Sequence, residues 1–150
     1  MKRRANATNA AGTFETVRAL GLALPGVEST TKYDGSPVLK VGGAFMAGLA
    51  THPSAEGGTL VVRSGIEERA SLLEDAPETY YLPDYYRSHP VVLVRLARID
   101  RDALRDLLSV SWRLTLPKAR RRRASQVDQH GRLPGPDPHH RRIEEQQHRR

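Results

Sequence analysis

Apolar residues with helical spacing come first in the part of the chain that is expected to fold. Thr13 is a suitable N-cap for a first helix, Glu15 favours its first turn, and Pro25-Gly26 ends it. The apolar positions of this helix share one face, which is expected to pack on a core: Phe14, Val17, Leu20 and Leu24.

Extended segments follow, with glycine between two of them. Residues 36–41 and 44–50 flank Gly42-Gly43, and a tight two-residue turn needs the positive φ that glycine adopts freely. The pattern therefore predicts a β-hairpin, followed by a third strand over residues 59–63. Next, Ser64-Gly65-Ile66-Glu67 matches a capping box at the start of a second helix. The expected buried stripe of that helix is Ile66, Ala70 and Leu73.

The last part of the folded region combines aromatic residues, a strand and a helix. Four of the five tyrosines lie within residues 80–86, and residues 91–97 are the most β-like stretch of the chain. Asp100 is the expected N-cap of the last helix. One face of this helix is apolar and is expected to be buried: Leu104, Leu107, Leu108 and Trp112.

These elements predict an α+β fold, in which helices pack on one face of an antiparallel sheet. After Pro117 the apolar pattern ends, and a segment so poor in apolar residues cannot offset the entropy lost on ordering. We therefore expect a flexible basic N-terminus over residues 1–12, a domain over residues 13–118, and a disordered basic tail over residues 119–150.

The net charge of +7 changes this picture only through its distribution. Residues 5–117 hold eleven Lys and Arg against thirteen Asp and Glu, a net charge of −2. Residues 118–150 hold ten Lys and Arg against four Asp and Glu, a net charge of +6, and three more cations lie at positions 2–4. The expected domain is therefore nearly neutral, and the positive charge lies at the two ends of the chain.

Other features of the composition exclude some classes of protein. The chain has no cysteine, which excludes a disulfide framework and a thiolate zinc site. No apolar run approaches the roughly 18 residues that a membrane-spanning helix needs, and no signal-peptide core follows the basic start. We expect a cytoplasmic protein with no membrane partner and no cofactor.

Residues 14–118 contain a series of motifs: LALPGVE, the VGG hairpin, LVVR before EERASLL, YYLPDYY, and VVLVRLARIDRDALRDLLSVSWRLTLPK. In their order and spacing these segments resemble the MmcQ/YjbR family, small bacterial proteins described as double-wing DNA-binding proteins. The resemblance implies the α+β fold and an association with DNA, the latter by analogy of fold. One departure is Ala44, since the family often has a lysine just after the hairpin glycines.

Strand alternation suggests one nucleic-acid-binding surface, and the end of the domain suggests another. If their strands are neighbours, Lys40, Arg63 and Arg95 form a basic stripe across one face of the sheet that tracks a phosphate backbone. Alternatively, these cations solvate the open face of a half-covered sheet. The second candidate surface follows the domain: Lys118, Arg120, Arg121, Arg122 and Arg123.

The tyrosine-rich segment suggests a site of a different kind. Its rings either line a ligand pocket or stack bases, together with a nearby histidine, or they serve only in packing. The candidate pocket residues are Tyr81, Tyr85, Tyr86 and His89. Asp84, Arg87 and His89 are suited to acid–base chemistry, but no nucleophile or second carboxylate lies at a spacing that would indicate a catalytic group. No catalytic residue is therefore predicted.

No dedicated metal site is expected either, because the adjacent tail histidines at positions 139, 140 and 148 lack a preorganised geometry. The leading hypothesis is a non-enzymatic DNA-binding module of low sequence specificity. The alternative is a module that binds a small molecule or a protein through the open sheet face or the segment 80–86. The sequence does not indicate an oligomeric state.

Overall fold

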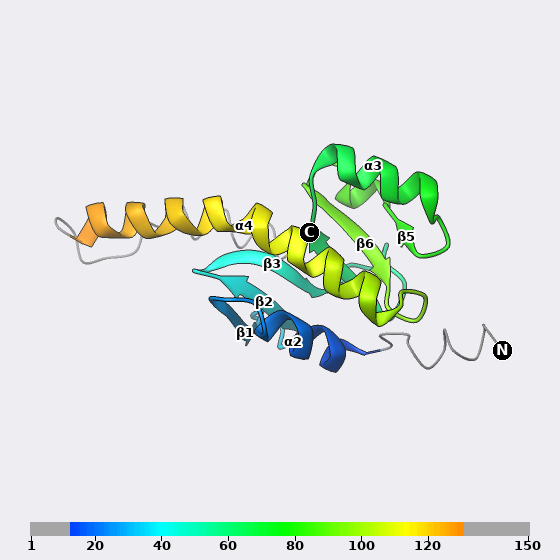
Figure 1. Cartoon of the computed structure of the whole chain (residues 1–150), viewed down its shortest axis with the longest axis horizontal. Coiled ribbons are helices and arrows are strands. Elements are labelled where there is room, and N and C mark those ends of the chain that lie inside the picture. The colour runs from blue at the N-terminus through cyan, green and yellow to red at the C-terminus, as the bar shows by residue number, and fades with distance from the viewer. Residues whose placement is uncertain (1–12, 131–150) are drawn as a thin grey trace.

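The computed structural model describes residues 13–130 of the 150-residue chain. Its helices are α2 (Phe14–Leu22), α3 (Ile66–Asp75) and α4 (Arg101–His130), with a short 3-10 helix η1 (Asp84–Tyr86) (Figure 1). Its strands are β1 (Val27–Thr31), β2 (Pro37–Val41), β3 (Ala44–Leu49), β4 (Thr59–Arg63), β5 (Tyr80–Tyr81) and β6 (Val91–Arg95). The predicted α+β class is confirmed.

All six strands form one antiparallel sheet in the order β1-β2-β3-β4-β6-β5. The predicted hairpin joins β2 to β3, where Val41 pairs with Ala44 across Gly42 and Gly43. Both glycines have positive φ, 54° and 83°, as a tight turn of this kind requires. Strand β1, which the sequence pattern did not predict, pairs with β2 and forms one edge of the sheet.

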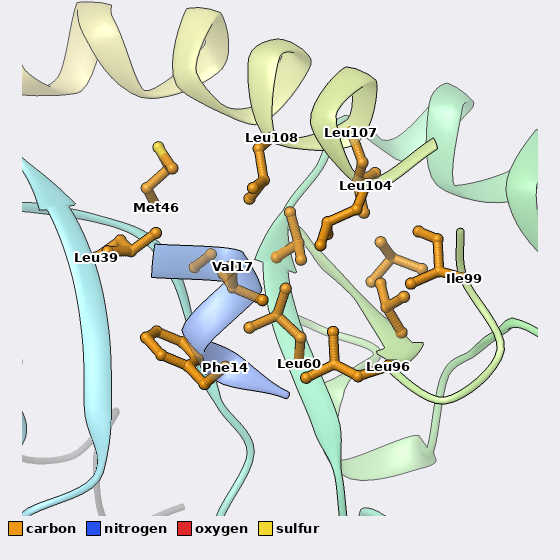
Figure 2. Packing of buried hydrophobic residues seen from close by; sticks show 14 of the residues in the cluster. Phe14, Val17, Leu39, Met46, Leu60, Leu96, Ile99, Leu104, Leu107 and Leu108 are labelled. Carbon is orange, nitrogen blue, oxygen red and sulfur yellow. The ribbon is translucent and has the colours of Figure 1, made fainter. Parts of the chain in front are cut away.

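The main core lies between one face of the sheet and the helices α2 and α4 (Figure 2). Leu104, Leu107 and Leu108 of α4 are buried in it, as predicted. The carboxylate of Asp100 accepts a hydrogen bond of 2.8 Å from the amide of Ala103, which confirms the predicted N-cap. Trp112 packs against this core half-buried, and its indole N–H donates to the carbonyl of Pro25 at 2.8 Å.

The opposite face of the sheet, here called the second face, carries a smaller core over β4 and β6. Val61, Val91 and Leu93 are buried there beneath Tyr86. Further side chains from β3, from the loop after it and from the tyrosine-rich segment pack around them: Phe45, Ala50, Ala55, Tyr81, Leu82 and Tyr85. The second face is therefore not open over β4 and β6, because residues 80–86 fold back across it.

Helix α3 differs from its prediction in both its start and its buried face. Its N-cap is Gly65 rather than Ser64, and the Glu68 carboxylate accepts the Gly65 amide at 3.2 Å. Of the predicted stripe, Ile66 is 59% exposed and Ala70 is exposed, whereas Leu73 is half-buried and packs against the main core. The helix instead buries Arg69, together with the half-buried side chains of Leu72 and Leu73.

Helix α4 continues past the predicted domain boundary at Lys118. It includes Pro117, and its backbone is helical to His130. Ala119 is buried in the main core, so the packed region reaches at least one residue beyond the predicted domain. The predicted flexible N-terminus, residues 1–12, and the last part of the predicted tail, residues 131–150, lie outside the described residues. Within residues 13–130, no helix has the length and apolarity to cross a membrane.

Candidate nucleic-acid interface

The three predicted strand cations share the second face but do not form one stripe. Arg63 lies at the end of β4 opposite Val91, whereas Arg95 lies at the other end of the same ladder, opposite Thr59. The two positions are four residues apart along the ladder, a distance of about 13 Å in the strand direction. Lys40 of β2 pairs with Phe45, whose carbonyl oxygen accepts a 2.9 Å hydrogen bond from Arg63 Nε. Lys40 and Arg63 therefore lie at the hairpin end of the sheet, and Arg95 lies at the opposite end.

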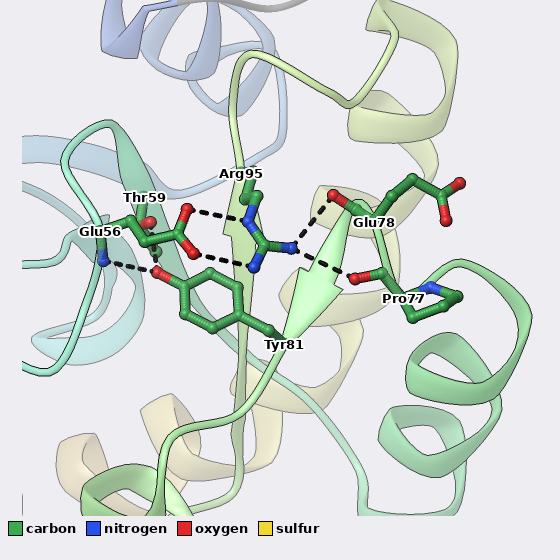
Figure 3. Close-up of polar contacts among 6 residues, drawn as sticks. All are labelled: Glu56, Thr59, Pro77, Glu78, Tyr81 and Arg95. Atoms are coloured by element: carbon green, nitrogen blue, oxygen red, sulfur yellow. Dashed lines mark hydrogen bonds and ion pairs between the residues drawn. The ribbon is translucent and has the colours of Figure 1, made fainter.

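Arg95 is held by a network of interactions with the protein itself (Figure 3). Its Nε and Nη2 donate to the two carboxylate oxygens of Glu56 at 2.9 and 2.8 Å. Its Nη1 donates to the carbonyl oxygens of Pro77 and Glu78 at 3.2 and 3.1 Å. The guanidinium carbon lies 4.2 Å from the centroid of the Tyr81 ring. Since every nitrogen of this guanidinium has a protein acceptor, Arg95 joins three segments of chain and is not arranged to receive a phosphate.

Tyr81 belongs to the same network and is not arranged as the wall of a pocket. Its hydroxyl oxygen lies 2.6 Å from Thr59 Oγ1 and accepts the amide of Glu56 at 2.8 Å. The hydrogen bonds from Arg95 hold the pKa of Glu56 below its usual range, and the same interaction raises the pKa of Arg95. The network thus joins the loop before β4 to both β5 and β6.

This network is expected to contribute to stability in a pH-dependent way. Because the pKa of Glu56 is lower in the folded chain, its contribution is present above the pKa of an unfolded glutamate, about 4.3, and is lost as the pH falls through the folded value. In Glu56→Gln that contribution is absent. The melting temperatures of the parent and the variant, measured by circular dichroism, should therefore differ at pH 7 and converge below about pH 4. A difference that stays constant between pH 7 and pH 3 would contradict this assignment.

The remaining predicted pocket residues come together with a histidine that sequence reasoning missed. The His52 and Tyr85 rings stack with centroids 3.5 Å apart and an interplanar angle of 12°. Tyr86 meets Tyr85 edge-on at 4.9 Å, and His89 lies 6.2 Å from Tyr85. Tyr86 is buried, which raises the pKa of its hydroxyl. These rings pack on one another and on the second face, an arrangement that accounts for them without a ligand.

The residues considered for acid–base chemistry are arranged as surface and structural contacts. Asp84 and Arg87 form an exposed ion pair at 3.1 Å, three residues apart in the chain. The backbone carbonyl of His89 accepts a hydrogen bond from Arg69. Among the residues that the structure describes, no three His, Cys, Asp or Glu side chains are grouped so that they could hold a metal ion. The tail histidines at positions 139, 140 and 148 lie outside those residues.

The second predicted surface lies on α4. Lys118 and Arg120 are exposed, and the backbone at positions 121–123 continues the same helix. Residues 107–127 contain six Lys and Arg and no Asp or Glu, and the nearest carboxylates along the helix are Asp106 and Asp128 at the two ends of this stretch. Figure 1 shows the end of α4 running on past the sheet, so the basic residues project from the body of the domain.

A comparison with protein-family models matches the YjbR model over residues 22–114. The chain belongs to the MmcQ/YjbR family. The matched region contains the whole sheet and ends within α4, before the basic positions 118–123. A search of curated proteins finds no match. The YjbR match thus covers the whole sheet and its second face. The basic end of α4, positions 118–123, is a feature of this chain outside the matched region.

Proposed function

We propose that this YjbR-family chain is a non-enzymatic module that binds duplex DNA with little base specificity, mainly through the basic end of α4. The observation that carries the proposal is the uncompensated charge of that helix, six cations and no acid over residues 107–127. The rest of the domain does not supply such a surface, because residues 5–117 carry a net charge of −2. Most of the salt-dependent affinity is therefore expected to come from this projecting element.

The helical backbone at these positions gives the charges a useful geometry. The backbone is helical throughout positions 120–123. The major groove of B-form DNA is about 12 Å wide and admits an α-helix, with phosphates on both sides. A helix with consecutive cations in its sequence suits interactions with these phosphates, and phosphate contacts carry no direct sequence information.

The proposal is tested by replacing the four arginines at positions 120–123 with glutamine. Removing one phosphate-binding cation should reduce the slope of log K against log salt by about 0.9 for duplex DNA. The variant is therefore expected to bind with a slope lower by up to about 3.6, largely independent of DNA sequence. Fluorescence anisotropy with a labelled duplex, titrated at several salt concentrations, measures the slope.

A matched control removes the same charge from exposed arginines of the body. The control is a single protein with four Arg→Gln substitutions, at Arg87, Arg98, Arg101 and Arg105. Its slope should change by less than about 1, because these residues are not expected to bind phosphate. Equal reductions in the two variants would show that only net charge matters. Failure of the full chain to bind duplex DNA at about 50 mM salt, where phosphate interactions are strong, would overturn the proposal itself.

A further inference from the structure

Three side chains from adjacent strands lie together at the hairpin end of the second face. Lys40 of β2 pairs with Phe45 of β3, and Arg63 of β4 donates from Nε to the Phe45 carbonyl oxygen at 2.9 Å. Phe45 packs half-buried at the margin of the smaller core. We call Lys40, Phe45 and Arg63 the hairpin-end row: two cations on the strands that flank Phe45.

Arg63 differs from the other half-buried and buried arginines in how its guanidinium is used. Arg95 and Arg69 direct their terminal nitrogens to carboxylate or carbonyl oxygens. Among the described residues, the terminal nitrogens of Arg63 have no hydrogen-bond acceptor and no carboxylate within ion-pair distance; only Nε is bonded. Its partial burial lowers the pKa of this guanidinium. A partly desolvated cation with two unused donor groups is suited to a bidentate acceptor such as a phosphate.

Lys40 adds a second charge without being neutralised by its neighbour. Glu28 is its cross-strand partner on β1, yet within the described part of the chain no ion pair joins the two side chains. Both cations of the row lie on the same face as Phe45, because Lys40 is its cross-strand partner and Arg63 shares the face of Val61 in the smaller core. The row therefore presents two positive charges on the strands that flank β3.

The course of α4 brings its basic end to this same end of the sheet. The helix begins at Arg101, soon after β6 ends at Arg95, and its Ser111 hydroxyl donates to the carbonyl of Met46 at 3.1 Å. Met46 follows Phe45 directly in β3. Since α4 continues in the same direction beyond Ser111, its C-terminal part leaves the body at the hairpin end (Figure 1).

From these observations we propose that Arg63 and Lys40 bind a backbone phosphate of the same nucleic acid that the basic end of α4 holds. The inference rests on the proposed function and adds a second point of attachment on the folded body. The Arg63 terminal nitrogens take two phosphate oxygens, and the Lys40 ammonium approaches the same group or the next one. Attachment through two different elements fixes the register and orientation of the duplex, which a single projecting helix does not.

The test uses the full chain with Lys40→Gln and Arg63→Gln together. Removal of one or two phosphate-binding cations should lower the slope of log K against log salt by about 0.9–1.8 for duplex DNA. A control with Arg98→Gln and Arg101→Gln removes the same charge from exposed positions and should retain the parent slope. Arg63→Lys keeps the charge and should reduce the slope less than Arg63→Gln does. Circular dichroism melts of each variant verify that the fold is retained.

The outcomes separate this inference from the function on which it rests. Suppose that the parent binds duplex DNA and that the variant with Lys40→Gln and Arg63→Gln is folded but keeps the parent slope. The inference then fails, and only the basic end of α4 binds the duplex. If the parent does not bind, the proposed function fails first. In a separate experiment, inorganic phosphate is titrated into the protein and the backbone amide NMR signal of Arg63 is recorded. A shift of this signal would indicate a site for the free phosphate ion. A response to phosphate combined with an unchanged duplex slope would overturn the nucleic-acid assignment.

Discussion

Replacement of Leu108 by alanine is expected to lower the free energy of unfolding by about 3–4 kcal/mol. Leu108 is fully buried, and Figure 2 shows its side chain pointing from α4 into the main core beside Met46 and Val17. Truncation removes apolar burial and leaves a cavity where α4, α2 and the sheet meet, a place where three rigid elements limit relaxation. Urea denaturation should show a lower midpoint with an unchanged m-value.

Leu22 provides the matched control for this substitution. It is the last residue of α2 and is 46% exposed, so Leu22→Ala removes the same atoms without opening a cavity. The free energy of unfolding of Leu22→Ala should lie within about 0.5 kcal/mol of the parent value. Similar effects of the two substitutions would mean that the main core is not centred on the packing of α4 against the sheet.

The parts of the fold that local rules decide were predictable from the sequence. Gly42-Gly43 supplies the positive φ of the hairpin, Asp100 supplies an N-cap, and residues 59–63 form a strand with the predicted limits. Each of these depends on a few neighbouring residues and elementary geometry. Strand β1 was missed because its sequence, VESTT, has one buried apolar residue and four exposed polar ones. Its pairing with β2 at the sheet edge makes it a strand, and propensity alone does not.

The candidate site was predicted in part, because alternation defines a face but not a position along it. The sequence correctly placed Lys40, Arg63 and Arg95 on one face of the sheet. It did not show that β4 and β6 run antiparallel in a register that separates Arg63 from Arg95. Nor did it show that Glu56, 39 residues away in the chain, would bind Arg95. His52 was missed for the same reason, since its stacking partner Tyr85 is brought to it by tertiary structure.

The buried face of helix α3 was predicted only in part, for Leu73, because its buried residue is an arginine. Arg69 is 8% exposed, and its guanidinium donates to three backbone carbonyls. The acceptors are His89 at 2.7 Å, Val91 at 3.1 Å and Arg87 at 3.4 Å. Charged side chains are rarely buried unless paired, so a pattern of apolar residues favours a face that includes Ile66 and Ala70 instead of Arg69. The acceptors come from a distant loop, which local spacing does not reveal.

Replacement of Arg69 by methionine is expected to lower the free energy of unfolding by about 3 kcal/mol. Methionine keeps most of the aliphatic packing, so the destabilisation comes from the missing hydrogen bonds of a charged donor and from carbonyls left without their partner. Those carbonyls belong to the chain from the end of η1 to the first residue of β6. Their release should also raise the hydrogen-exchange rates of residues 87–91 more than those of the β2–β3 hairpin.

Arg87→Met is the matched control, because it removes an equal charge from an exposed side chain whose partner is Asp84. Exposed ion pairs three residues apart contribute little to stability. Arg87→Met should therefore lower the free energy of unfolding by less than about 0.5 kcal/mol. Chemical denaturation of the parent and the two variants measures the difference. If Arg69→Met were as stable as Arg87→Met, the buried guanidinium would contribute nothing beyond its packing. The three carbonyl hydrogen bonds would then be a consequence of how α3 docks on β6. A large destabilisation confined to Arg69→Met would instead identify them as the interactions that hold α3 and the tyrosine-rich segment against the sheet.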